Sequence, residues 1–142
     1  MSIRRRRALL GASLLAASAC AAPPAADVAF PVDKTFAWIG TDAGGARRNS
    51  PADATRYTIT LEASGRATMR LDCNRGSAQW HRDGDRLVFS PIAATKMMCP
   101  RGSLDVAFAS DLTQVDGWRV DGETLVLAGR DGSTMRFRSA AP

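Results

Sequence analysis

The residues with the most distinctive chemistry in this 142-residue sequence are its three cysteines and its single histidine. Cys73 follows an alternating run in which Ala67, Met69 and Leu71 share one face, so the run predicts a strand with Cys73 turned inward. Cys99 ends a later apolar stretch that we expect to return across the same core. We therefore predict a disulfide between Cys73 and Cys99. The alternative is two separate buried thiols, because small apolar cysteines pack well in a core.

This cross-link would carry a large part of the stability. The loop from Cys73 to Cys99 holds 27 residues, counting both ends. By chain entropy, a disulfide that closes such a loop stabilises the fold by about 3–4 kcal/mol. The whole stability of a typical domain is only about 5–15 kcal/mol.

Metal or nucleophile chemistry is poorly supported by the same residues. A zinc site needs three or four ligands, and Cys73, Cys99 and His81 match no compact ligand spacing. His81 stands in a polar stretch and is expected to be solvated. Four aspartates flank glycine turns without forming the dense oxygen-ligand repeat of a calcium loop: Asp83, Asp85, Asp121 and Asp131. We predict no catalytic residues, no metal and no cofactor.

Two polar residues directly after Cys73 are candidates for a binding surface. Asn74 and Arg75 precede Gly76, and the three residues predict a tight turn beside the cross-link. The structural alternative is that Asn74 supplies hydrogen bonds to the turn and Gly76 an unusual backbone angle.

The N-terminal stretch predicts export and a membrane anchor. Residues 1–19 combine a basic start, Arg4–Arg7, with a short apolar run that ends in small residues, as a signal peptide does. Cys20 then stands where a bacterial lipoprotein carries its lipid, although Ala17 replaces the commoner leucine. The alternatives are ordinary cleavage at an Ala-x-Ala site and twin-arginine export. Residues 20–32 read as the lipidated cysteine and a flexible tether.

This interpretation changes the charge argument. The chain has 19 basic and 14 acidic residues, and four of the arginines but none of the acids precede Cys20. The mature chain therefore keeps fifteen basic against fourteen acidic residues, a net charge of +1. Such a balance argues against nucleic acid as a partner. The remaining 123 residues suit one domain, expected over 33–142.

The elements expected to position these residues are short strands and one helix. Alternation and turn residues predict strands over 35–39, 55–61, 66–73, 77–81, 86–90, 118–120, 123–128 and 133–138. We expect Thr41–Ala54 to be loop and Ile92–Cys99 to be an irregular, apolar crossing. An amphipathic helix is predicted from Leu104 to Gln114, with Ser103 as its N-cap. The fold class is mostly β (α+β): a small curled antiparallel sheet or open barrel with one helix.

These motifs, in this order, resemble the META domain, the family of HslJ-like heat-shock and envelope lipoproteins. Its likeness is carried by four segments: Asp72–Gly76, Leu87–Phe89, Ala94–Pro100 and Leu125–Leu127. The resemblance implies a mostly-β domain placed in the cell envelope and associated with stress or antibiotic tolerance. It implies no established enzymatic activity.

Taken together, these features predict a non-enzymatic exported lipoprotein that supports envelope integrity or stress and antibiotic tolerance. Its location would be the periplasmic side of the bacterial outer membrane, with Cys20 as the lipid anchor. Its partner would be an envelope protein or a lipophilic ligand. The alternative is an enzyme or inhibitor-like binder that acts on a cell-wall or small-molecule substrate.

Overall fold

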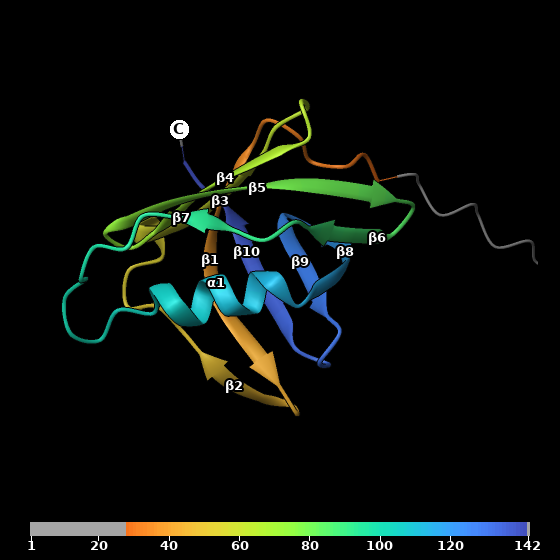
Figure 1. Cartoon of the computed structure of the whole chain (residues 1–142). Helices are drawn as coiled ribbons and strands as arrows, with labels where there is room; N and C mark the ends of the chain where they lie inside the picture. Colours follow the sequence, from red (N-terminus) through yellow and green to blue (C-terminus); the bar gives the residue numbers. More distant parts are fainter. Residues whose placement is uncertain (1–27, 142) are drawn as a thin grey trace, which may run out of the picture.

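Alternating apolar and polar residues build a closed ring of antiparallel strands in the computed structural model, which describes residues 28–141 (Figure 1). Eight strands form the ring, in this order around it: β1 (Thr35–Ala43), β3 (Tyr57–Leu61), β4 (Arg66–Leu71), β5 (Asn74–Asp83), β6 (Arg86–Phe89), β8 (Val115–Asp121), β9 (Thr124–Gly129) and β10 (Thr134–Ser139). Pairing between β10 and β1 closes it. The prediction of a mostly-β fold with one helix is confirmed, and the predicted curled sheet or open barrel fits in part: the strands do form a barrel, but it is closed because β10 pairs with β1.

A glycine in β1 allows this closure. The first part of β1 pairs with β3, and a longer part pairs with β10, with a bulge between Trp38 and Gly40. Gly40 has φ +147°, which side chains rarely adopt, and a Cβ there would lie 2.7 Å from the Asn49 carbonyl oxygen. A bulge with glycine bends a strand and increases its twist. β1 can therefore leave β3 and continue along β10.

Two further strands and two helical segments lie outside the ring. β2 (Ala46–Asn49) pairs with the end of β1, and β7 (Ala93–Ala94) pairs with β5. A short 3₁₀ turn, η1 (Ala54–Arg56), precedes β3, and α1 (Asp105–Thr113) packs across the barrel. The predicted helix is confirmed to within one residue at each end. Leu104 is the N-cap in place of the predicted Ser103.

The helix completes the core with one aromatic side chain. Phe108 is fully buried, and its ring centroid lies 5.0 Å from that of Trp38 and 5.9 Å from that of Tyr57. Phe137 of β10 approaches it from another side at 6.1 Å. Trp38 is thus a core aromatic. The barrel interior is filled by the side chains on the inward faces of the strands.

The prediction that Thr41–Ala54 is loop is wrong for residues 41–49, where the end of β1 and β2 form a hairpin that long-range ion pairs hold in place, and right for residues 50–53. Arg48 of β2 pairs with Asp111 of α1 and with Asp131 at 3.4 Å, and Thr41 Oγ1 donates to Asp111 Oδ2 at 2.6 Å. Asp111 is buried, so these bonds offset its desolvation. Hydrogen bonds from Ser133, with a smaller contribution from Arg48, lower the pKa of Asp131. The residues that neighbour Arg48 in the sequence do not indicate that it pairs with Asp111 and Asp131.

Phe108→Ala should lower the free energy of unfolding by about 3–5 kcal/mol, because it empties the centre of the aromatic cluster. The measurement is reversible urea unfolding at equilibrium. Val106→Ala on the same helix is the matched control, since Val106 is 76% exposed and should change stability by less than about 0.5 kcal/mol. A loss below about 1 kcal/mol for Phe108→Ala would contradict this packing.

Candidate functional site

The turn between β4 and β5 organises one end of the barrel. Leu71 pairs with Asn74, so Asp72 and Cys73 form the turn, and Asn74, Arg75 and Gly76 begin β5. The predicted Asn74–Gly76 turn is therefore wrong. Asp72 has φ +60°, a conformation that aspartate tolerates better than most residues.

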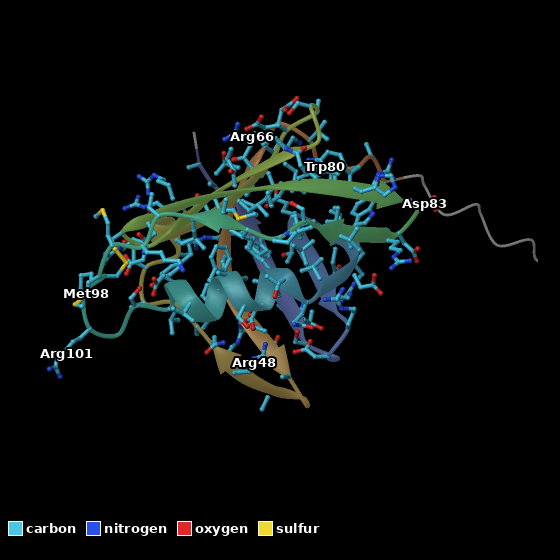
Figure 2. The ribbon with its side chains drawn as sticks, in the orientation of Figure 1. Arg48, Arg66, Trp80, Asp83, Met98 and Arg101 are labelled. Atoms are coloured by element: carbon cyan, nitrogen blue, oxygen red, sulfur yellow. A yellow bond between two sulfur atoms is a disulfide. The ribbon has the colours of Figure 1, made fainter. Side chains whose placement is uncertain are left out.

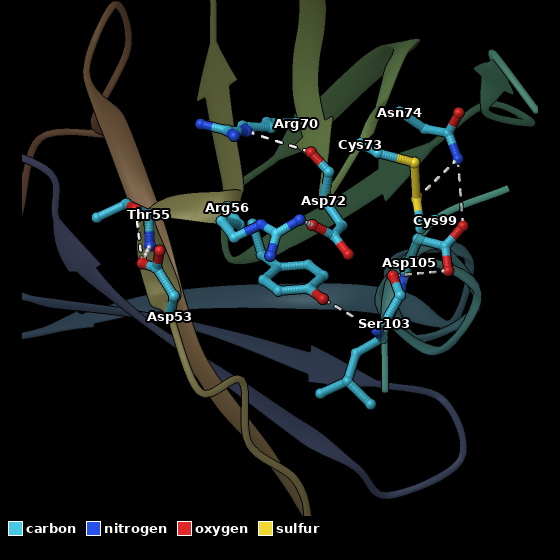
Figure 3. Close-up of polar contacts among 12 residues, drawn as sticks. Asp53, Thr55, Arg56, Arg70, Asp72, Cys73, Asn74, Cys99, Ser103 and Asp105 are labelled. Carbon is cyan, nitrogen blue, oxygen red and sulfur yellow. Dashed lines mark hydrogen bonds and ion pairs between the residues drawn. A yellow bond between two sulfur atoms is a disulfide. The ribbon is translucent and has the colours of Figure 1, made fainter. Parts of the chain in front are cut away.

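A buried ion pair fixes this turn. The Asp72 carboxylate is buried and pairs with Arg56, while its backbone N–H donates to the Arg56 carbonyl oxygen at 2.7 Å (Figure 3). Because Asp72 turns inward, the alternation of β4 stops at Leu71. Cys73 is therefore half-buried at the end of the barrel, and the prediction that it shares the core face of β4 is wrong.

Cys73 and Cys99 are joined by a disulfide, with Cα atoms 5.5 Å apart. The predicted bond required a Cα separation below about 7 Å. It ties the β4–β5 turn to the segment that leads into α1 (Figure 3). The bond thus connects the sheet to a stretch with little secondary structure of its own.

Asn74 is the centre of the polar contacts beside the disulfide. Its Oδ1 accepts hydrogen bonds from the Met97 N–H at 2.8 Å and from Thr95 Oγ1 at 2.9 Å. Its Nδ2 donates to the Met97 carbonyl oxygen at 3.1 Å and to Asp105 Oδ2 at 3.2 Å. One side chain therefore links β5, the crossing segment and the first turn of α1.

The two residues predicted as a binding surface have different roles. Asn74 is only 4% exposed, and its polar atoms are used internally. Arg75 is exposed, and its N–H donates to Thr95 Oγ1 at 3.0 Å. The alternative that Asn74 supplies structural hydrogen bonds fits, but these bonds hold the crossing segment and not a turn. Arg75 remains available at the surface.

Tyr57 and Ser103 position the start of the helix. The Tyr57 hydroxyl accepts a hydrogen bond from the Leu104 N–H at 2.9 Å. Ser103 Oγ lies 3.1 Å from Asp105 Oδ1 and accepts from the Asp105 N–H at 3.3 Å. Asp105, placed in the first turn as predicted, faces Asn74 across the gap (Figure 3). Neither role is visible in the sequence, because Tyr57 bonds to Leu104 and Asp105 to Asn74, and both partners are remote along the chain.

The apolar residues of the crossing segment do not enter the core. Met97 is 61% exposed and Met98 is 99% exposed, which contradicts their predicted place across the core. Ile92 alone packs against the core from this segment. The reason is that Asn74 fixes the backbone at Met97 by hydrogen bonds, so no apolar packing is needed there.

An open groove runs between this segment and α1, with a volume of about 810 Å³. Its walls are mostly apolar, and its lining includes the apolar side chains of Leu71, Ile92, Met97, Met98, Val106 and Ala109. Val106 does not share the helical face that carries Phe108 and Leu112. This spacing is the signal in the sequence that could have predicted an exposed position for Val106. Thr95, Asn74 and Asp105 line the polar part, and Asn74 is hydrogen-bonded to both of the others.

The groove is suited to binding an apolar group. No set of three or more His, Cys, Asp or Glu within residues 28–141 is placed to hold a metal ion. Asp53 lies in a neighbouring hollow, where hydrogen bonds from the Thr55 hydroxyl and N–H lower its pKa. His81 is exposed on β5, far along the strand from Asn74.

The predicted lipid anchor and the predicted export signal are not among the residues that the structure describes. Cys20 and the signal segment 1–19 lie outside the described residues, as does the part of the tether before residue 28. None of the helices within the described part of the chain is long and apolar enough to cross a bilayer.

Comparison with known proteins gives a family and a fold. A family model described as META domain matches residues 34–142. An NMR structure of a protein from Burkholderia xenovorans is 23% identical with a TM-score of 0.64, over 86% of this chain and 99% of that chain. A crystal structure of a DUF4847 family protein from Bacteroides vulgatus is 19% identical with a TM-score of 0.52, over 74% of this chain and 91% of that chain. At these identities the likeness shows the fold. No curated protein matches the chain.

Reducing the Cys73–Cys99 disulfide should lower the free energy of unfolding by up to about 3–4 kcal/mol, because the unfolded chain regains the freedom of the closed loop. Urea unfolding with and without reductant measures this, in a Cys20→Ala background so that one cysteine pair is tested. The far-UV circular dichroism of the reduced protein should keep its strand signal. Reaction of both cysteines with a thiol reagent in folded, oxidised protein would contradict the bond.

Proposed function

The chain belongs to the META domain family, and from this premise we propose that it is a non-enzymatic, exported binding protein of the bacterial cell envelope. Its role would be to support envelope integrity or tolerance of stress and antibiotics. It would act by holding an apolar partner, either a lipophilic ligand or an apolar segment of an envelope protein, in the groove between the crossing segment and α1.

The observation that carries this proposal is the apolar groove itself. Contiguous exposed apolar surface on a small protein commonly marks an interaction site. Met97 and Met98 form one rim and Val106 the other, and all three are well exposed. Methionine side chains adapt to apolar partners of different shape.

The groove is also pre-formed, which favours binding. The disulfide and the hydrogen bonds of the Asn74 side chain hold the wall that carries Met97. The opposite wall is a helix fixed through buried Phe108. A site that is already ordered loses less conformational entropy when its partner binds.

The polar groups in the groove support binding over catalysis. Thr95 and Asp105 are each hydrogen-bonded to Asn74, and these bonds restrain the side chains that a reaction would need. General acid–base work requires a titratable group free to reach a substrate proton. Asp105 instead faces the amide of Asn74 and the hydroxyl of Ser103.

Export and lipid attachment at Cys20 complete the proposal. Their support is the basic start, the short apolar run and the small residues that precede this cysteine. Ala21 follows it, which fits transfer to the outer membrane. A lipid there would place the groove in the periplasm at the membrane, close to lipophilic molecules and other envelope proteins.

A photo-crosslinking residue at position 106 should yield adducts in intact envelopes, because Val106 stands at the groove rim. A crosslinker in place of Ala46, which is exposed on β2, is the matched control and should not give the same adducts. Adding Ala109→Glu, which places a charge in the groove, should abolish the position 106 adducts. Identical adducts from both positions, or no effect of Ala109→Glu, would contradict binding in the groove.

Cys20→Ala should move the protein from the membrane fraction to the soluble fraction, because the lipid anchor would be lost. Fractionation of envelopes followed by immunoblotting measures the distribution. Arg119→Ala, an exposed change on β8 that keeps Cys20, should leave the protein on the membrane. An unchanged distribution of Cys20→Ala would show that the chain is not held by a lipid at this position.

A further inference from the structure

Two neighbouring methionines are presented to solvent at one end of the molecule. The methionine tip consists of Lys96, Met97 and Met98, with Met98 99% exposed and Met97 61% exposed. Figure 2 shows Met98 and Arg101 at the outer end of the crossing segment. Large apolar side chains exposed side by side on a small protein call for an explanation.

The tip is held in place, so its exposure is built into the fold. Asn74 bonds to both the N–H and the carbonyl oxygen of Met97. The Thr95 N–H donates to the Arg75 carbonyl oxygen at 2.9 Å on one side of the tip, and Cys99 is disulfide-bonded on the other. The backbone therefore cannot fold the methionines back onto the core without breaking these bonds.

Cations surround the tip. Lys96 and Arg101 flank the methionines along the chain, and Arg75 lies beside them at the start of β5. Arg75 is also paired across the strands with Arg70, an arrangement of like charges that is unfavourable without an anion nearby. Within residues 28–141, no ion pair involves any of these four side chains.

The carboxylates of this end are used internally and do not neutralise the tip. Asp72 is buried against Arg56, and Asp105 bonds to Asn74 and Ser103. Asp53 accepts two hydrogen bonds from Thr55. Residues 91–104 contain no acidic residue. The methionine tip therefore presents two apolar side chains to solvent, with cationic side chains around them.

We propose that the methionine tip docks on an anionic phospholipid bilayer. Met97 and Met98 enter the boundary between head groups and acyl chains, while Lys96, Arg75 and Arg101 lie at the level of the phosphates. The charge is complementary to an anionic surface, and apolar side chains flanked by cations are the composition of interfacial membrane contacts. A bilayer fits because Met98, which is 99% exposed, can enter the acyl boundary while Lys96 and Arg101, its neighbours along the chain, stay at the level of the phosphates.

The predicted anchor is compatible with this contact. Phe30 packs on Trp80 at 4.9 Å between ring centroids, so the tether leaves near the far part of β5. Six residues of β5 separate Asn74 from Trp80, or about 20 Å of strand. Ten residues from Cys20 to Phe30 can reach at most about 35 Å. A lipid at Cys20 and the tip could therefore touch one membrane, and two weak attachments hold better than one.

This inference rests on the proposed function only in placing the protein at a membrane, and its test uses purified components. The full chain with Cys20→Ala is oxidised with hydrogen peroxide, and the oxidation of each methionine is followed by mass spectrometry. Vesicles of phosphatidylcholine with phosphatidylglycerol should slow oxidation of Met97 and Met98 severalfold, whereas pure phosphatidylcholine should not. Buried Met69 and Met135 are internal controls.

A variant that reverses two charges tests whether the methionine tip, and not another part of the surface, contacts the membrane. Lys96→Glu/Arg101→Glu should weaken the protective effect of the anionic vesicles by at least about tenfold in lipid concentration, since each cation near such a surface contributes about fivefold in affinity. Arg119→Glu, an exposed change on β8, is the control and should leave protection unchanged.

Three results would overturn the inference. Equal oxidation with and without anionic vesicles would show that the tip does not touch them, and equal protection by neutral vesicles would remove the role of charge. Protection that depends on protein concentration without lipid would assign the tip to a second copy of the chain. If adducts from position 106 persist while vesicle protection fails, the groove proposal stands and the membrane inference is wrong.

Discussion

The buried amide of Asn74 is the interaction on which the functional end of this molecule depends. It is only 4% exposed, and it bonds to the backbone of Met97, the hydroxyl of Thr95 and the carboxylate of Asp105. Breaking one of these bonds would leave a partly buried polar group without a partner, which costs about 1–3 kcal/mol. The disulfide beside it restrains the same segment covalently. Together they hold a wall that has almost no secondary structure of its own.

Closure of the barrel is a second constraint, and it explains why a helix is needed. A ring of eight strands has no free edge between its first and last members. The short strands β2 and β7 remain outside the ring: β7 pairs with β5, and β2 is tied to α1 by the ion pair of Arg48 with Asp111. The helix therefore fills the core through Phe108 and also fixes β2.

The way this end is stabilised also frees apolar surface for binding. Hydrogen bonds and a disulfide, instead of apolar burial, hold the crossing segment. Met97, Met98 and Val106 are consequently not required by the core and line an open groove. An exposed apolar surface carries a risk of aggregation. The cations around the methionine tip oppose self-association, since like charges repel, and they favour a partner of opposite charge.

The sequence by itself determined the local features whose causes are local. Alternation placed β3, β4 and β10 and their inward side chains, helical spacing placed α1 and Phe108, and two cysteines indicated a cross-link. The motifs around Cys73 and Cys99 also indicated the family. Each of these signals lies within a short window of residues, where spacing alone fixes which side chains share a face.

Only the tertiary structure decided the features that depend on remote partners. β2 pairs with β1 across the Gly44–Gly45 turn, but its position against α1 is set by the ion pairs of Arg48 with Asp111 and Asp131. The β4–β5 turn falls at Asp72 and Cys73 because Arg56 pairs with the buried Asp72 carboxylate. Met97 and Met98 look like core residues in sequence, yet Asn74 holds their backbone at the surface. In each case one polar contact between residues far apart in the chain outweighs the local pattern, and such a contact has no signature in either segment alone.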